Sequence, residues 1–209
     1  MFFRTFPAPA RRLFTRLGRE PVVRAFYLAG GPAAPLHLGH RVSMDLDIFT
    51  NEPFSPATLT SGLQAIGPLA IQQQKADALA ALLGGVQISF FHYPYPALEA
   101  PSVYRGVRIA SLLDIALMKV IAISQRGRRR DFVDLYAISQ AHYPLQDLLR
   151  RLPEKYPSLS HPTYHLLRAL SYFEDAEKDP PLRMLADYSW RKVKTFFTRQ
   201  VEELARRPS

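Results

Sequence analysis

The stretch LGHRVSMDLDIFTNEPF, residues 38–54, places two aspartates one residue apart in a largely apolar run. Successive side chains of a strand point to opposite faces, so Asp45 and Asp47 share one face while Leu46 points to the other. Met44 and Ile48 are expected on the face of Leu46. Because two carboxylates so close repel each other unless a cation lies between them, the stretch predicts a strand that carries a cation site.

The composition is that of a globular protein. The 209 residues are 47% hydrophobic and 22% charged, which is typical of one domain, or of one domain with a small helical appendage. No run of about 18 apolar residues occurs, so we predict no membrane span. The arginine-rich first 20 residues lack an apolar signal-peptide core and predict a leading helix or tail. The absence of cysteine excludes disulfides and thiolate metal sites and fits a cytoplasmic location.

The charge balance indicates the kind of partner. Lysine and arginine number 27 against 18 aspartates and glutamates, which gives a net charge of +9 and a pI near 10. Such an excess attracts phosphate-bearing molecules. We therefore favour nucleotide or nucleic-acid binding, with the solubility of a small basic protein as the alternative explanation.

Short strands and helices are expected on either side of the two aspartates. The apolar run from Val22 ends at the Gly30–Gly31 pair, which predicts a strand followed by a tight turn. A short helix should follow and end at Gly39. Ser55 is the expected N-cap of a helix that runs to Ile66.

A hairpin and a last strand complete the predicted sheet. Gly84 and Gly85 form the expected tight turn of the hairpin, and its second strand places Val86, Ile88 and Phe90 on one face. Residues 107–111 predict the last short strand. These elements indicate an α+β first half built on a small sheet.

Beyond Ser111 the apolar period becomes helical. Ser111 and Asp114 resemble a capping box, which predicts a helix start. Helical segments are expected at residues 112–125, 129–142, 145–152, 161–178 and 189–207. We therefore predict two lobes, an α+β lobe over residues 1–110 and a helical lobe over residues 111–209 that completes the site.

Lys119 stands in a helix that is apolar nearly all round and is therefore expected to be buried. A buried ammonium needs a fixed anion, which is either a carboxylate or a bound phosphate. The alternative is a lysine whose stem packs while its amine reaches water.

The segment RGRRRDFVDLY, residues 126–136, combines arginines with two acids. Asp131 and Asp134 lie three residues apart and share one face of a helix. Taken alone, the segment is typical of a solvated loop whose acids favour a helix N-terminus. Taken with Lys119, Gly30–Gly31 and the aspartate pair, it points to nucleotidyl transfer, because Mg²⁺ binds carboxylates and phosphates and glycine turns admit a triphosphate.

Two blocks of the chain carry a family resemblance. FYLAGGPAAPLHLGHRVSMDLDIFT, followed by VRIASLLDIALMKVIAISQRGRRRDFVDLYAIS, resembles the AbiEii/AbiGii-type toxins, which are nucleotidyltransferase-like proteins of the DNA polymerase β superfamily. The blocks lie in the same order as in that family and cover much of residues 26–140. The later helices contain no motif that matches.

The resemblance implies a nucleotidyltransferase-like fold and a Mg²⁺-dependent (or Mn²⁺-dependent) transfer of a nucleoside monophosphate from a nucleoside triphosphate to an acceptor such as RNA or tRNA. It also implies a toxin paired with an antitoxin, in phage defence or growth control. The implied metal ligands are Asp45 and Asp47. The implied catalytic residues are Asp45, Asp47, Lys119 and Asp134, and the implied nucleotide-binding residues are Gly30, Gly31, Arg41, Ser43, Lys119, Arg130 and Asp131.

Two positions differ from the family pattern and define an alternative function. Pro32 replaces the hydroxyl residue that commonly follows the glycine pair, and the strand that often supplies a third carboxylate offers Ser89 and His92. The alternative is a catalytically degenerate protein of the same fold that binds nucleic acid or a protein partner. A transferase that modifies a small cationic molecule is a third hypothesis, which the positive charge disfavours.

The remaining polar and aromatic motifs have structural explanations. His37 and His40 are three residues apart without a third ligand nearby, so zinc binding is not favoured, and His92 lies in an aromatic run typical of a core. The C-terminal segment interleaves aromatic residues with lysine and arginine, which fits either an RNA-facing helix or an amphipathic core helix.

Overall fold

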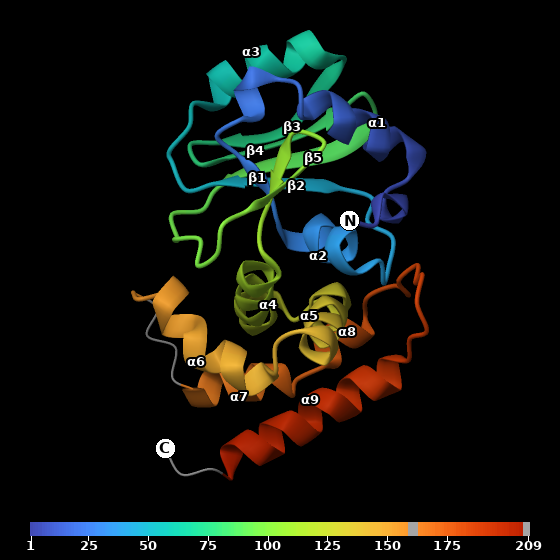
Figure 1. Ribbon diagram of the computed structural model, residues 1–209, viewed down its shortest axis with the longest axis vertical. Helices are drawn as coiled ribbons and strands as arrows, with labels where there is room; N and C mark the ends of the chain where they lie inside the picture. The colour runs from blue at the N-terminus through green and yellow to red at the C-terminus, as the bar shows by residue number, and fades with distance from the viewer. Residues whose placement is uncertain (159–162, 207–209) are drawn as a thin grey trace.

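A mixed sheet occupies the first half of the chain in the computed structural model, which describes residues 1–158 and 163–206 (Figure 1). Seven strands run in the order β3-β4-β5-β2-β1-β7-β6. Their bounds are β1 Tyr27–Leu28, β2 Leu46–Thr50, β3 Leu69–Lys75, β4 Ala78–Leu83, β5 Val86–His92, β6 Ser102–Tyr104 and β7 Val107–Ile109.

The hairpin of β4 and β5 forms as its sequence predicts. Gly84 and Gly85 both have positive φ angles in its turn, and Val86, Ile88 and Phe90 are buried on one face. The strand predicted from Val22 is much shorter than expected. Pro21–Val23 form a 3-10 helix instead, because a proline at its first position sets helical φ and offers no amide to a sheet. Strand β6 had no sequence prediction.

Strand β2 lies at the centre of the sheet and positions the aspartates. It pairs antiparallel with β1 and parallel with β5, and the β5 register places Ser89 directly beside Asp47. Leu46 and Ile48 are buried on one face of β2, so Asp47 points to the other face. The pairing of β2 with both neighbours thus fixes the position of Asp47 along the sheet and the face to which its carboxylate points.

Helices cover both faces of the sheet. Helices α1 (Ala8–Leu17) and α3 (Pro56–Ile66) lie above it in Figure 1, and α2 (Gly30–Leu38) lies below. The leading segment is therefore a helix, which buries Ala10, Leu13, Phe14 and Leu17. Helix α3 begins as predicted, because the Ser55 hydroxyl accepts a hydrogen bond from the Thr58 amide.

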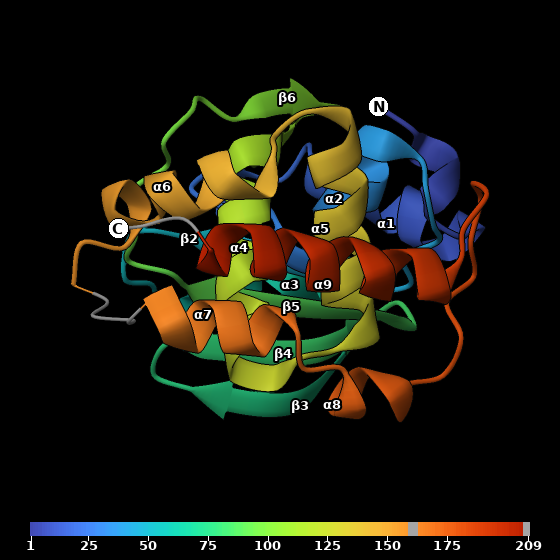
Figure 2. The same ribbon diagram turned by 90° about the horizontal axis from the view of Figure 1, so that it is seen from below.

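The second half of the chain is helical. Its helices are α4 Leu112–Arg126, α5 Arg129–Ala141, α6 Leu145–Lys155, α7 Thr163–Leu170, α8 Glu174–Glu177 and α9 Trp190–Ala205. Seen from below, α6, α7 and α9 lie in front of α4 and α5 (Figure 2). The segment 161–178, expected to be helical throughout, is divided between α7 and α8, and its first two residues lie outside the described part.

The chain changes from strands to helices between residues 109 and 112. Strand β7 ends at Ile109 and α4 begins at Leu112. Helix α2 packs against both α4 and α5, so it connects the sheet to the helical half. The α+β class with a helical second half is confirmed. Within residues 1–158 and 163–206, no helix has the length and apolar character of a membrane span.

Candidate active site

Asp45 and Asp47 lie at the start of β2. Asp47 is a strand residue, whereas Asp45 lies in the bend just before the strand, and both are half-buried. Met44 is 61% exposed, contrary to the expectation that it shares the buried face of Leu46. The reason is that regular alternation begins only where the strand begins, at Leu46.

The glycine pair lies directly against Asp47. Gly30 has a φ of 63° and opens α2, so the residues predicted as a turn form the first turn of the helix. A Cβ atom at Gly30 would lie 3.3 Å from Oδ2 of Asp47 and 3.4 Å from Phe49. Glycine therefore satisfies both a left-handed backbone and a close approach. A Cβ atom at Gly31 would lie 3.4 Å from the same Oδ2 atom.

The charges around Asp47 come from both halves of the chain. Burial raises the pKa of Asp47, and the nearby Asp45 carboxylate raises it further, while Arg130 and Lys119 act in the opposite direction. Among the cations, Arg130 has the larger effect on this carboxylate. Its Nε atom is buried and has no hydrogen-bond partner among the described residues. The charge of the Arg130 guanidinium therefore acts on Asp47, while its Nε atom is left without a hydrogen-bond partner among the described residues.

Asp134 is the centre of a buried network that joins α5 to α2 and the loop after it. Its carboxylate accepts hydrogen bonds from Arg41 Nε (2.6 Å), Arg41 Nη2 (2.7 Å) and His40 Nε2 (2.9 Å). Lys119 Nζ lies 2.7 Å from the Oδ2 atom of Asp134. Arg41 also donates to the Gly31 carbonyl at 2.8 Å. The network therefore fixes the Gly30–Gly31 turn, which in turn lies against Asp47.

These contacts hold the Asp134 carboxylate inside the core and stabilise its ionised form. Burial alone would raise the pKa of Asp134, but the charges of Arg41 and Lys119, with hydrogen bonds from His40 and Arg41, hold it well below its usual range. The side chain has no exposed surface, so an acceptor hydroxyl has no access to it. Arg41, predicted to bind nucleotide, is likewise buried. Its guanidinium donates hydrogen bonds to Asp134 and to the backbone carbonyls of Gly31 and Val42.

The Asp134 network predicts acid sensitivity. The folded pKa of Asp134 lies below the unfolded value of about 3.9, so its stabilising contribution is complete above about pH 4 and is lost as the pH falls towards the folded pKa. We expect the melting temperature, measured by circular dichroism between pH 7 and pH 2, to fall below pH 4. An Asp134→Asn variant should show a shallower decline in this range, by the equivalent of about one proton. Equal slopes for the two proteins would contradict the assignment.

Lys119 is paired with carboxylates, which decides between the alternatives for a buried lysine. Its side chain is 2% exposed and its Nζ atom lies 2.7 Å from Asp131 Oδ1 as well as from Asp134. Asp131 is also bonded by Arg126, whose Nε atom lies 3.0 Å from Asp131 Oδ2. Asp131 and Asp134 therefore share one helix face, as predicted, and together neutralise Lys119.

The arginine run divides into paired and unpaired members. Arg128 forms an ion pair with Asp179, and Arg129 contacts the Ala176 carbonyl and the ring of Trp190. Among residues 128–130, only Arg130 has no hydrogen bond or ion pair to the described residues, although it acts on Asp47 through its charge. Ser43, another predicted nucleotide contact, is buried, and its amide is bonded to the Thr5 carbonyl.

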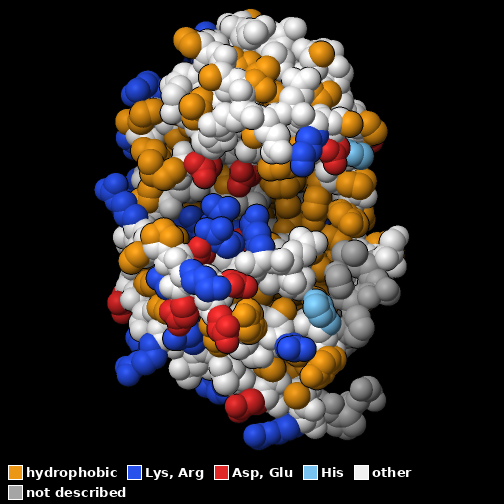
Figure 3. Space-filling view, turned by 180° about the vertical axis from the view of Figure 1, so that it is seen from behind, with side chains coloured by type: hydrophobic (Ala, Val, Ile, Leu, Met, Phe, Trp, Pro, Cys, Tyr) orange, Lys and Arg blue, Asp and Glu red, His pale blue; other side chains and the backbone are white. Residues whose placement is uncertain are grey.

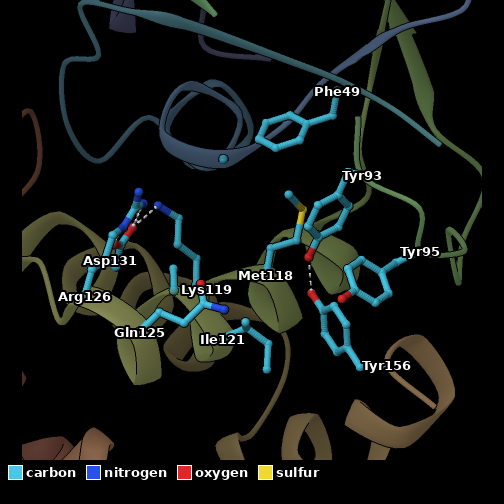
Figure 4. A pocket seen from close by; sticks show the side chains of 12 residues that line it. Phe49, Tyr93, Tyr95, Met118, Lys119, Ile121, Gln125, Arg126, Asp131 and Tyr156 are labelled. Carbon is cyan, nitrogen blue, oxygen red and sulfur yellow. Dashed lines mark hydrogen bonds and ion pairs between the residues drawn. The ribbon is translucent and has the colours of Figure 1, made fainter. Parts of the chain in front are cut away.

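A cavity of about 210 Å³ opens between the sheet and the helical half (Figure 4). It adjoins Asp47 through Gly30, which forms part of its wall. Of the predicted site residues, it is lined by Gly30, Lys119 and Asp131. Arg126 and a group of aromatic and apolar side chains line it as well; the latter include Phe49, Tyr93, Tyr95, Met118 and Tyr156. In the surface view, acidic side chains face a cluster of basic ones across a hollow, with apolar surface next to them (Figure 3).

The aromatic lining was missed at the level of sequence. From the sequence we predict a structural role for His92 and assign no role to the rings beside it, although alternation after the buried Phe90 directs Phe91 and Tyr93 to the face of Asp47. Tyr156 gives no comparable local signal, because it follows α6 and reaches the cavity only through the packing of that helix.

The other motifs have structural contacts. His37 bonds the Ala110 carbonyl and His40 bonds Asp134, and the described residues contain no group of three or more histidines, cysteines or acids fit to hold a metal. In α9, Phe197 is buried and Trp190 packs edge-on against Phe132. The core explanation therefore accounts for these two aromatic side chains.

Comparison with known proteins identifies the family. Residues 80–203 match the family model described as nucleotidyl transferase AbiEii toxin, type IV TA system. The matched range contains Lys119, Asp131 and Asp134, whereas Asp45 and Asp47 precede it. The chain is also 37% identical over 183 residues to an uncharacterised protein, aq_aa25, of Aquifex aeolicus (strain VF5), covering 85% of this chain and 87% of the relative.

Two solved structures share the fold. A crystal structure of a candidate nucleotidyltransferase from H. pylori aligns over 93% of this chain and 91% of its own, with a TM-score of 0.54 and 15% identity. MenT4, a nucleotidyltransferase toxin of Mycobacterium tuberculosis H37Rv, aligns over 97% of this chain and 87% of its own, with a TM-score of 0.51 and 11% identity. Because the family model matches more than half of the chain, this protein belongs to the AbiEii nucleotidyltransferase toxin family of type IV toxin–antitoxin systems.

Proposed function

We propose that this nucleotidyltransferase uses Mg²⁺ to move a nucleoside monophosphate from a nucleoside triphosphate to RNA. The observation that carries the proposal is the pair Asp45 and Asp47, because Asp47 lies against Gly30 of the cavity wall and is acted on by the charge of Arg130. Two carboxylates and a neighbouring cation are the groups that phosphoryl transfer requires.

The residues present fit a magnesium ion. Mg²⁺ characteristically takes one or two protein carboxylates and completes its shell with water and substrate phosphates. Asp45 and Asp47 supply two carboxylates, and Ser89, beside Asp47 in the sheet register, adds a neutral hydroxyl in place of a third acid. When bound, the ion would act as a Lewis acid that offsets the negative charge of the phosphates.

The chain's own residues bind and orient the substrate in this proposal. The start of α2 at Gly30 faces the triphosphate, because a helix N-terminus favours anions. Arg130 and Arg126 contact phosphate oxygens and offset the charge that develops on them. Lys119 is positioned by Asp131 and Asp134, and its neutralised charge makes it a weaker phosphate ligand than Arg130.

Charge on the first helix supports RNA as the acceptor. Residues 1–19 contain Arg4, Arg11, Arg12, Arg16 and Arg19 and no acid, and these arginines form no ion pair within the described residues. The apolar side of α1 is buried in the core, which leaves the arginines to face solvent. A series of unpaired arginines is suited to the phosphates of a nucleic acid. An antitoxin partner and a cytoplasmic site of action are proposed on the basis of the family.

The test is transfer of label to RNA. Purified protein, Mg²⁺, total RNA and each α-labelled nucleoside triphosphate in turn should yield labelled RNA for at least one nucleotide, and EDTA should abolish the label. Parallel reactions contain protein without RNA and RNA without protein. Label on a small molecule or on a protein would contradict the RNA acceptor but keep the enzyme.

Absence of label with all four nucleotides, across several RNA preparations, would instead favour the degenerate binding protein. Pro32 is the observation behind that alternative, because it removes one amide from the first turn of α2. The same protein would then bind RNA equally well with EDTA and with Mg²⁺.

A further inference from the structure

The cavity beside the aspartates has two chemically different ends. Figure 4 shows Lys119, Arg126 and Asp131 on one side and Phe49, Tyr93, Tyr95 and Tyr156 on the other, with Met118 next to Tyr93. Ion pairs of Lys119 and Arg126 with Asp131 account for the charged end, whereas the function proposed above assigns no role to the aromatic end.

The charged end adjoins the aspartate pair. Gly30 lines the cavity, and a Cβ atom there would lie 3.3 Å from Asp47 Oδ2. The same position lies 3.4 Å from the Phe49 ring, so the glycine marks the point where the charged and aromatic walls meet. A molecule that enters with one end at Asp47 therefore has its other end between the rings.

The aromatic rings form a connected wall drawn from both halves of the chain. The centroids of Tyr93 and Tyr95 are 4.8 Å apart, those of Tyr95 and Tyr156 are also 4.8 Å apart, and Phe49 lies 5.7 Å from Tyr93. The hydroxyls of Tyr93 and Tyr156 are hydrogen-bonded at 2.6 Å. This bond connects the segment after β5 to the end of α6 across the cavity.

A buried ion pair holds the segment that carries Tyr93 and Tyr95. Asp114 accepts hydrogen bonds from the amides of Leu98 and Glu99. Lys155 donates to Asp114 at 2.7 Å and to the Pro96 carbonyl at 2.7 Å. These hydrogen bonds hold the backbone next to Tyr93 and Tyr95, so the aromatic wall is preorganised for a ligand.

We propose that the aromatic end of this cavity binds the nucleobase of the nucleoside triphosphate, whose phosphates lie at the charged end beside Asp47; the inference rests on the function proposed above. Phe49, Tyr93 and Tyr95 are half-buried, which leaves ring surface for contact with a base. Bases stack on aromatic side chains, and such contacts contribute to binding without requiring a charge. Gln125, whose amide is a donor and an acceptor, also lines the cavity and offers hydrogen bonds to a base edge.

The test separates the two ends by comparing a nucleotide with inorganic tripolyphosphate, which has the phosphates but no base. Tyr95→Leu and Phe49→Leu should each weaken binding of the preferred nucleoside triphosphate by about tenfold or more, measured by calorimetry with Mg²⁺. Binding of tripolyphosphate should be unchanged. Arg130→Gln should weaken both ligands, because it removes a contact to phosphate.

Three matched variants control for folding and for ring chemistry. Tyr95→Phe retains the ring and should bind the nucleotide more tightly than Tyr95→Leu does. Tyr93→Phe removes the bond to Tyr156 and tests whether the link between the two halves contributes. Tyr172→Leu removes an exposed tyrosine outside the cavity lining and should change neither ligand.

The outcomes distinguish this inference from the proposed function. Native binding and transfer together with unaltered nucleotide affinity in Tyr95→Leu and Phe49→Leu would overturn the base site and leave the transferase proposal intact. Equal loss of nucleotide and tripolyphosphate in these variants would also overturn it, since the effect would then be on the fold or the phosphates. Failure of the native protein to bind any nucleoside triphosphate would overturn both.

Discussion

Replacement of Asp47 by asparagine is expected to reduce nucleotidyl transfer by on the order of a thousandfold or more, because the metal supplies several kcal/mol of charge stabilisation and about 1.4 kcal/mol corresponds to tenfold in rate. The measurement is the initial rate of RNA labelling at saturating nucleotide. Asp45→Asn should have an effect of the same kind. Asp77→Asn, which changes an exposed acid between β3 and β4, should keep the native rate.

The same Asp47→Asn substitution should leave the fold equally stable or more stable. Burial and the Asp45 carboxylate raise the pKa of Asp47, so its ionised form is disfavoured in the folded protein at neutral pH, and removal of the charge relieves that repulsion. Mg²⁺ should raise the melting temperature of the native protein and not of the variant, since only the former binds the ion. A variant that unfolds would contradict the expected stability, and one that keeps full activity would contradict the metal assignment.

Asp134→Asn is expected to have the largest effect on stability. It leaves Arg41 and Lys119 buried without a full counter-charge, and breaking a buried ion pair costs about 3–5 kcal/mol. For a chain of this size the melting temperature should fall by roughly 6–20 °C, at about 2–4 °C per kcal/mol. Thermal unfolding at pH 7, followed by circular dichroism, measures the change.

An exposed ion pair provides the control for Asp134. Asp147 is paired with Arg150 on the surface of α6, and Asp147→Asn should change stability by less than about 1 kcal/mol. If the two asparagine variants melted together, the Asp134 network would not connect α5 to the glycine turn as the contacts indicate. The comparison is informative because both substitutions remove one charge and conserve side-chain shape.

Local chemistry made much of the fold predictable. The Gly84–Gly85 hairpin, the Ser55 cap and the Ser111 cap all depend on neighbouring residues, and each forms as expected. Asp114 shows the limit of such reasoning. It occupies the predicted first turn, but its carboxylate bonds the amides of Leu98 and Glu99 rather than the amides of its own helix entrance. That contact joins residues distant along the chain.

By itself, the sequence determined the α+β class, the helical second half, the strand that carries Asp47 and the burial of the helix that carries Lys119. Hydrophobic periodicity, helix capping and the energetic penalty of burying a charge depend on residues close together in sequence, and they can therefore be recognised from the sequence alone. Only the tertiary structure decided that Asp134 anchors Arg41, that the charge of Arg130 acts on Asp47, and that Tyr156 meets Tyr93. These assignments depend on which helix packs against which strand, because a side chain's partners across the core are set by three-dimensional packing and not by its neighbours in sequence.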